Sequence, residues 1–208
     1  MVYTHHMVKE PSQKHIIRIA KKHFLAFGYV GARMQAIADE VGVNKALLHY
    51  YYKNKEGLFK KVFDEEAKKM IASTEEIACR KIPILNKIQL LIENDINNLL
   101  KNPSLPMFIM REMARDQSLI KKFDPGARGD AILSIVAKEI SEAQKKGVIR
   151  KGVSVQDIFI NMGAMAMFPI LAKPFCMSGS KMTEKEYNAW LVDRKKTVPE
   201  FVIRAIKA

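Results

Sequence analysis

Residues 33–52 read RMQAIADEVGVNKALLHYYY, and this stretch decides the fold. Apolar residues recur at helical spacing on both sides of the tripeptide GVN, which predicts one short helix that ends at Val41 and another that begins at Lys45. Gly42 suits the turn because glycine adopts positive φ without strain, and Asn44 is a preferred N-cap residue. Two short helices joined by such a turn are typical of a helix-turn-helix.

The second of these helices keeps one face free for contacts outside its own domain. The inward-facing residues are expected to be Ile37, Ala38, Val41, Val43 and Leu48. The outward face then carries Lys45, Ala46, His49, Tyr50 and Tyr51, with Lys53 and Lys55 directly after. Donors interleaved with aromatic hydroxyls suit the phosphates and base edges of DNA. The alternative is that the tyrosines pack inside a small helical unit and the lysines are only solvated.

Helical periodicity continues on both sides, so the fold class is all-α and no strand is needed. A first helix is expected from Ser12 to Phe27, with Gly28 as its C-cap, and Asn54 is expected to cap a long amphipathic helix. Further helices are predicted over 83–101, 105–115, 127–146, 155–172 and 183–207. Pro199 is expected to kink or break the last of these.

The charge of the chain favours a polyanionic partner. Its 35 Lys and Arg exceed its 22 Asp and Glu, and residues 1–62 alone hold eleven basic and four acidic residues. Nucleic acid or an anionic membrane surface would suit this balance, as would a merely soluble basic protein. The hydrophobic fraction of 48% is enough for a core.

Other classes of site find little support in the sequence. Cys79 and Cys176 are expected to be reduced, buried thiols of a cytoplasmic protein. The longest apolar run, 163–172, is too short to cross a bilayer, so no membrane contact is expected. We expect no metal site and no cofactor, because the five histidines do not pair with cysteines at ligand spacing.

Residues 16–59 resemble, without a gap, the N-terminal domain of the TetR family of bacterial regulators. The elements that carry the resemblance are Phe24, Gly28-Tyr29, Ile37-Ala38, Val41-Gly42-Val43, Lys45, the run 48–52, Lys55-Glu56 and Leu58. The resemblance implies a helix-turn-helix domain in 1–53 and a helical domain in 54–208 for ligand binding and dimerisation. It also implies a repressor released from a palindromic operator by a small apolar or amphipathic effector.

Site residues follow from the same resemblance. The expected DNA contacts are Arg33, Gln35, Asn44, Lys45, Ala46, His49, Tyr50, Tyr51 and Lys55. The sequence departs from the family at His49, Tyr51 and Tyr52, where Tyr, His and Phe are usual, and at Ala32, near which a hydroxyl residue is usual. These departures are expected to alter the operator sequence rather than DNA binding itself.

The resemblance after residue 75 rests on helix number and order alone. Candidate pocket residues are Phe108, Met110, Met113, Met162, Met165 and Phe168, because methionine and aromatic side chains line adaptable apolar pockets. For any one of them, an ordinary core position is the favoured alternative. The homodimer is expected to form through the helices that contain 159–169 and 187–206, with a stripe at Tyr187, Leu191, Val198, Phe201 and Val202.

Two other functions compete with this interpretation. An architectural protein that binds DNA without a ligand would show weak sequence preference and steep salt dependence. A helical enzyme would need a nucleophile and base, a metal set or a phosphate loop, and the sequence shows none, so no enzyme is expected.

Overall fold

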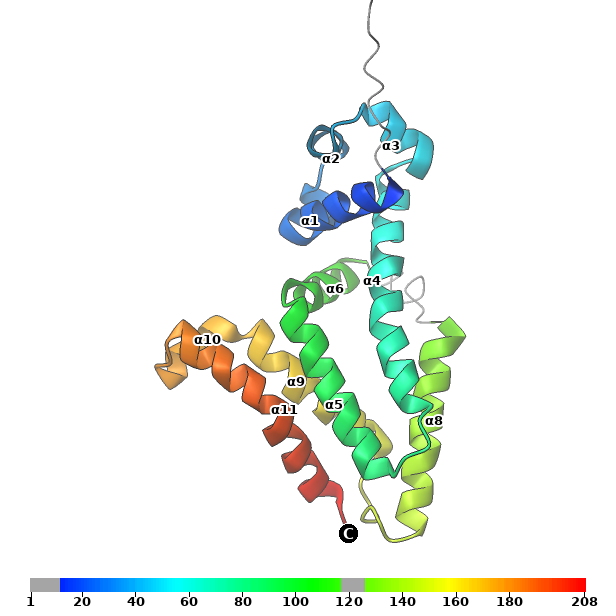
Figure 1. The fold of residues 1–208 in the computed structure, drawn as a ribbon, viewed down its shortest axis with the longest axis vertical. Coiled ribbons are helices and arrows are strands. Elements are labelled where there is room, and N and C mark those ends of the chain that lie inside the picture. The colour runs from blue at the N-terminus through cyan, green and yellow to red at the C-terminus, as the bar shows by residue number, and fades with distance from the viewer. Residues whose placement is uncertain (1–11, 117–125) are drawn as a thin grey trace, which may run out of the picture. The chain divides into compact units, whose positions relative to one another are not determined.

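A computed structural model of the chain describes residues 12–116 and 126–208. The side chains of Ala67, Met70, Met113 and 126–130 lie outside the described residues. The described chain is helical, which confirms the predicted all-α class (Figure 1). Its one extended pairing in the described part is an isolated antiparallel bridge between Ile149 and Lys207.

Contacts group the chain into two compact units, divided between Glu66 and Ala67. This division lies inside helix α4 (Lys55–Ala78), so the first part of α4 belongs with the N-terminal helices. The boundary between functional domains at residues 53 and 54 stays a prediction.

The first unit contains α1 (Gln13–Gly31), α2 (Met34–Val41), α3 (Lys45–Tyr52) and the first part of α4. Its fully buried side chains include Ile16, Ala20, Phe24, Ile37, Ala38, Leu48 and Leu58. The rings of Phe24 and Phe59 meet edge to face with their centroids 5.1 Å apart. This core joins α1 to α4. Helix α2 packs against α1, and α3 packs against α2.

Helix α1 is interrupted where the sequence predicts its end. Gly28 is buried and has φ 67° and ψ 179°, which lies outside helical geometry and favours glycine. The chain nevertheless makes another turn to Gly31, where the prediction ended the helix at Phe27. The Ala32 N–H donates to the Gly28 carbonyl at 3.1 Å, and this bond closes the extra turn.

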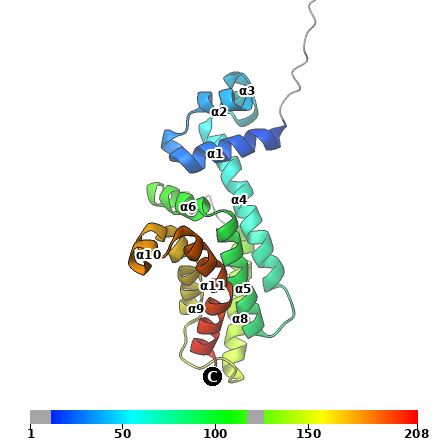
Figure 2. The ribbon, with the colours of Figure 1, turned by 60° about the vertical axis from the view of Figure 1, so that its left-hand side comes forward.

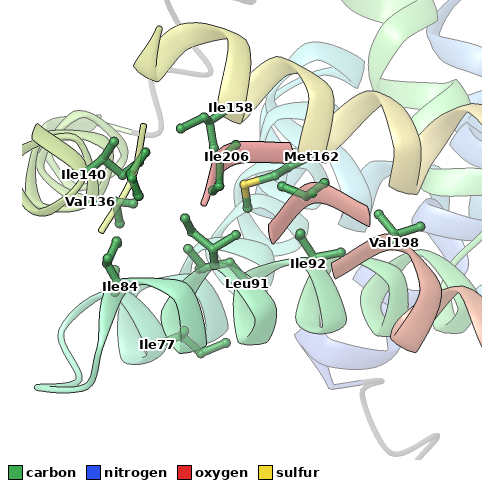
Figure 3. Packing of buried hydrophobic residues seen from close by; sticks show 14 of the residues in the cluster. Ile77, Ile84, Leu91, Ile92, Val136, Ile140, Ile158, Met162, Val198 and Ile206 are labelled. Atoms are coloured by element: carbon green, nitrogen blue, oxygen red, sulfur yellow. The ribbon is translucent and has the colours of Figure 1, made fainter. Parts of the chain in front are cut away.

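The second unit contains the end of α4 and the helices α5 (Ile84–Lys101), α6 (Ser104–Arg115), α8 (Gly126–Lys145), α9 (Val155–Leu171), α10 (Lys173–Ser180) and α11 (Glu184–Ile206). Helix α5 is central, because it packs against α8, α9 and α11. Figure 3 shows side chains of these four helices pointing toward one another, among them Leu91, Ile140, Met162 and Val198. They form one apolar core.

Three expectations from the sequence are wrong. Helix α10 is absent from the prediction because its Pro, Gly and Ser residues resemble a loop, but Pro174 lies in the first turn, where proline is tolerated. Helix α11 continues through Pro199, since buried residues on both sides hold it against the core. Cys79 directly follows α4 and is exposed, and Cys176 is half-buried.

Within the described residues, no single helix is long and apolar enough to cross a membrane. Helices α9 and α10 together reach that length and composition, but they are bent by 79° relative to each other.

Candidate DNA-binding surface

The turn between α2 and α3 is fixed by its own backbone. Gly42 has φ 80° and ψ 34°, a left-handed conformation, and its N–H donates to the Ala38 carbonyl at 2.9 Å. Val43 N–H donates to the same carbonyl at 3.0 Å. Asn44 Oδ1 then accepts from the Ala46 N–H at 2.9 Å and caps α3. The predicted helix-turn-helix geometry is present.

Helix α3 presents an exposed face opposite its one buried residue, Leu48. The exposed residues on this face are Lys45, Ala46, His49 and Tyr50. Tyr50 is 81% exposed, so its hydroxyl is available for an external partner. These positions share a helix face because they are separated by one, three, four or five residues. The structure therefore brings four of the expected DNA contacts together on one surface.

The other expected contacts are partly engaged inside the unit. Exposed Arg33 is the residue before α2, and exposed Gln35 donates to Asp39 Oδ1 at 2.8 Å. Half-buried Lys55 donates from Nζ to the Val30 carbonyl at 3.0 Å and lies over the ring of Tyr29, 4.8 Å from its centroid. In this structure Lys55 thus links the start of α4 to the end of α1.

The three consecutive tyrosines have different surroundings. Tyr50 and Tyr51 meet edge to face with centroids 5.4 Å apart, and Tyr51 is half-buried. The Tyr52 hydroxyl is buried without a hydrogen-bond partner in the described part of the chain. Burial, the largest cause, raises the pKa of Tyr52 above its ordinary value. Of the three tyrosines, Tyr50 is the exposed one.

The turn that ends α3 is strained, a feature that sequence reasoning missed. Lys53 has φ 63° and ψ −54°, and the Asn54 N–H donates to the Tyr52 carbonyl at 2.7 Å. This is a γ-turn of the rare positive-φ form. A Cβ on Gly57 would lie 2.1 Å from the Tyr52 oxygen, so only glycine fits there. The signal available in the sequence was a glycine in the first turn of α4.

Ion pairs hold the helix-turn-helix against α1. Glu40, on α2, accepts from Lys22 Nζ at 2.8 Å and from His23 Nε2 at 2.9 Å. The hydrogen bond from Lys22, followed by that from His23, lowers the pKa of Glu40. Lys21 Nζ lies 2.7 Å from Glu66 on α4. Adjacent lysines of α1 therefore reach two different helices of the unit.

The candidate pocket residues have mixed environments. Phe108 of α6 and Met162 of α9 are buried, and Met165 is half-buried. Met110 and Phe168 are mostly exposed. The side chain of Met113 lies outside the described residues. The structure thus supports an interior position for three of the six residues.

The expected dimer stripe is wrong for four of its five residues. Tyr187, Leu191, Val198 and Val202 are buried within the second unit, because they hold α11 against α5 and α9. Phe201 is 61% exposed. Helices α9, α10 and α11 lie close together in the second unit (Figure 2). Their other large exposed side chains are Ile160, Phe168, Phe175 and Val192.

Comparison with known proteins agrees with this description. Residues 16–62 match the family model for bacterial regulatory proteins of the tetR family. An uncharacterised HTH-type transcriptional regulator of Bacillus subtilis, YhgD, is 27% identical over 143 residues, which cover 66% of this chain and 72% of that protein. The fatty acid metabolism regulator protein of the same organism is 26% identical over 149 residues, covering 71% and 76% of the two chains.

A solved structure shows that the likeness extends over both units. The crystal structure of FadR from Bacillus subtilis in complex with stearoyl-CoA has a TM-score of 0.66 and 21% sequence identity, and the match covers 92% of this chain and 98% of that one. The match of fold, the helix-turn-helix geometry and the family model agree. The chain is a DNA-binding transcriptional regulator of the tetR family.

Proposed function

We propose that the protein is a dimeric repressor that binds a palindromic operator and is released by a fatty acyl effector. The observation that carries the proposal is the capped α3, whose exposed face combines Lys45, His49 and Tyr50. Such a face fits the major groove, which is wide enough for a helix. Architectural binding is less favoured, because side chains aimed at base edges would bring sequence preference.

The remaining proposed DNA contacts are Arg33, Gln35, Asn44, Ala46, Tyr51 and Lys55. Arg33 and Gln35 lie at the start of α2, where they suit flanking phosphates. Lys55 must leave the Val30 carbonyl to reach DNA, so we propose a smaller contribution for it. Asn44 contributes mainly through the cap that orients the first turn of α3.

The proposed homodimer forms through α9 and α11, with Ile160, Phe168 and Phe201 at its centre. Val192 lies nine residues from Phe201 and therefore on the opposite flank of α11. Large apolar patches on a soluble protein mark interaction surfaces. Ile160 and Phe168 are two helical turns apart on α9, so both lie on one side of that helix. A two-fold interface would bury the same residues of both protomers and separate their α3 helices by one turn of DNA.

The proposed effector is a fatty acyl thioester, and the support comes from the relatives. One is named for fatty acid metabolism, and FadR was crystallised with stearoyl-CoA. The candidates for contact with the acyl chain remain Phe108, Met110, Met113, Met162, Met165 and Phe168. The buried pair Phe108 and Met162 is favoured, and exposed Phe168, which the proposed dimer uses, is the least favoured. Near Phe108, buried Glu112 pairs with Arg115 at 2.9 Å. This ion pair offers polar groups beside the apolar side chains.

Release requires the effector to prefer a conformer that fits DNA less well. Helix α4 contributes residues to both units, so a change in the second unit can be transmitted through its backbone. We propose that this change alters the separation of the two α3 helices in the dimer.

The test is an operator titration with and without effector. DNA bound by the purified full chain is selected from a random pool, and the enriched sequence is then titrated at about 0.15 M salt. We expect stearoyl-CoA to lower operator affinity by about tenfold or more, while free CoA leaves it unchanged. Equal operator affinity with stearoyl-CoA, stearate and free CoA would contradict the proposed effector.

A further inference from the structure

His49 is an exposed residue of the α3 face whose ring has a fixed internal partner. Its Nδ1 lies 2.9 Å from the main-chain carbonyl oxygen of Lys53. The Lys53 N–H in turn donates to the His49 carbonyl at 2.8 Å. The contact of Nδ1 restricts rotation of the imidazole, and the main-chain bond fixes the backbone between His49 and Lys53.

This contact determines which ring nitrogen carries the proton. A carbonyl oxygen only accepts hydrogen bonds, so Nδ1 must be the donor. A neutral imidazole has a single N–H, which leaves Nε2 with a free lone pair. Nε2 points away from the ring edge that faces Lys53, and the side chain is exposed. Neutral His49 therefore offers an acceptor, and no donor, to a molecule bound at this surface.

The carbonyl that fixes the ring is itself held by the strained turn. Lys53 is the central residue of the γ-turn, and its φ of 63° is closed by the bond from Asn54 N–H to the Tyr52 carbonyl. Gly57 allows the Tyr52 oxygen to approach α4 closely. Strained backbone is retained where the surrounding structure determines it, often at functional sites. Here it positions an oxygen that selects one tautomer.

The donors and acceptors of DNA limit what such a ring can contact. Phosphate oxygens only accept, so they are no partner for the free lone pair of Nε2. In the major groove the exposed donors are the amino groups of adenine N6 and cytosine N4, whereas guanine and thymine present acceptors there. Lys45 lies one helical turn earlier and supplies a donor beside this acceptor.

We propose that His49 is a specificity-determining residue whose Nε2 accepts a hydrogen bond from the amino group of an adenine or cytosine in each operator half-site. The proposal rests on the proposed operator binding and adds the base chemistry that α3 reads. Because the acceptor is created by a main-chain carbonyl, the preference depends on the ring at position 49 and on the turn at Lys53.

The test compares operators that differ by one amino group. Wild type, His49→Ala and His49→Gln are each titrated with the selected operator and with a copy in which purine replaces adenine, or pyrimidin-2-one replaces cytosine. We expect removal of the amino group to weaken wild-type binding by about fivefold and to leave His49→Ala unaffected. His49→Gln retains an acceptor oxygen and should keep part of the preference.

Thermal melting verifies that the variants fold, and alanine is the residue most compatible with a helix. An equal loss in wild type and His49→Ala at every adenine and cytosine of the half-site would overturn the proposal for His49. Failure of wild type to enrich any sequence would instead overturn the proposed operator binding, so the two failures are distinguishable.

Discussion

The two units of the chain differ in how they use large apolar side chains. In the first unit the core is closed by short helices whose ends are capped locally, and its functional face is polar and aromatic. In the second unit the core is filled, yet Ile160, Phe168 and Phe201 remain in solvent. The first unit exposes two comparable side chains, Phe27 and Val30, and both lie at the end of α1. The exposed face of α3 in the first unit is thus polar and aromatic, whereas α9 and α11 of the second unit expose large apolar side chains.

The largest effect is expected from Gly57→Ala in the first unit. The new Cβ would lie 2.1 Å from the Tyr52 carbonyl oxygen, so the turn that orients α3 must move. We expect the free energy of unfolding to fall by about 3 kcal/mol, measured by urea titration, with loss of operator binding. Gly163→Ala, on α9, is the matched control because, apart from its chain neighbours and the backbone of its own helix, no atom lies within 4 Å of its added Cβ. Equal stability of the two variants would contradict the role given to Gly57.

Phe201→Glu tests the apolar surface of the second unit. A carboxylate at the centre of the proposed interface would be desolvated, so the dimer should be weakened by about 2 kcal/mol or more. Sedimentation equilibrium measures this directly. Leu133→Glu, at an exposed position of α8, is the control and should leave the dimer intact. A dimer unaffected by Phe201→Glu would remove α11 from the interface.

The variant Asp95→Asn tests how much a buried carboxylate destabilises the second unit. Burial raises its pKa to about 6. A carboxyl in the unfolded chain titrates near pH 4, so the folded state loses relative stability as pH rises between these values, and the loss is complete above about pH 6. Asp95→Asn should therefore raise the free energy of unfolding by about 2 kcal/mol near pH 8 and by little near pH 4.

Urea unfolding at both pH values measures the effect of Asp95→Asn. Asp193→Asn, an exposed carboxylate on α11, serves as control and should show no comparable pH-dependent gain. A gain for Asp95→Asn that is as large at the lower pH as at the higher would show that ionisation is not its cause.

The smallest effects are expected at the helix caps, where the two units should behave alike. Asn44 Oδ1 caps α3, and the Thr183 hydroxyl accepts from the Glu186 N–H at 3.3 Å at the start of α11. Replacement of either cap residue by alanine should cost about 1 kcal/mol in chemical unfolding. Only Asn44→Ala should also weaken operator binding, because it loosens the first turn of α3. Unchanged affinity would mean that the cap serves stability alone.

The first unit was largely predictable from sequence because its determinants are local. The glycine turn, the Asn44 cap, the buried Ile37 and Leu48 and the exposed face of α3 lie within twenty residues. The strained turn at Lys53 was not predictable, since a lysine carries no signal for positive φ. The hydrogen bond from Lys55 to the Val30 carbonyl was not predictable either, because the two residues are 25 positions apart.

In the second unit, the sequence predicted the order and approximate bounds of the helices apart from α10, but not how they pack. Periodicity locates helices but leaves open which apolar stripe faces the chain's own core and which faces a partner. Tyr187 and Phe201 belong to one helix, yet only the first is buried in the core of the unit. The prediction of a kink or break at Pro199 failed for a related reason, because tertiary packing on both sides of the proline outweighs its local cost.

The measurement that tests the central claim most directly is the affinity of the purified full chain for its selected operator, relative to a scrambled duplex of the same composition, at about physiological salt. As a sequence-specific regulator, it should bind the operator as a dimer and at least about a thousandfold more tightly than the scrambled DNA. Equal affinities for both duplexes, falling together as salt rises, would contradict specific recognition through α3.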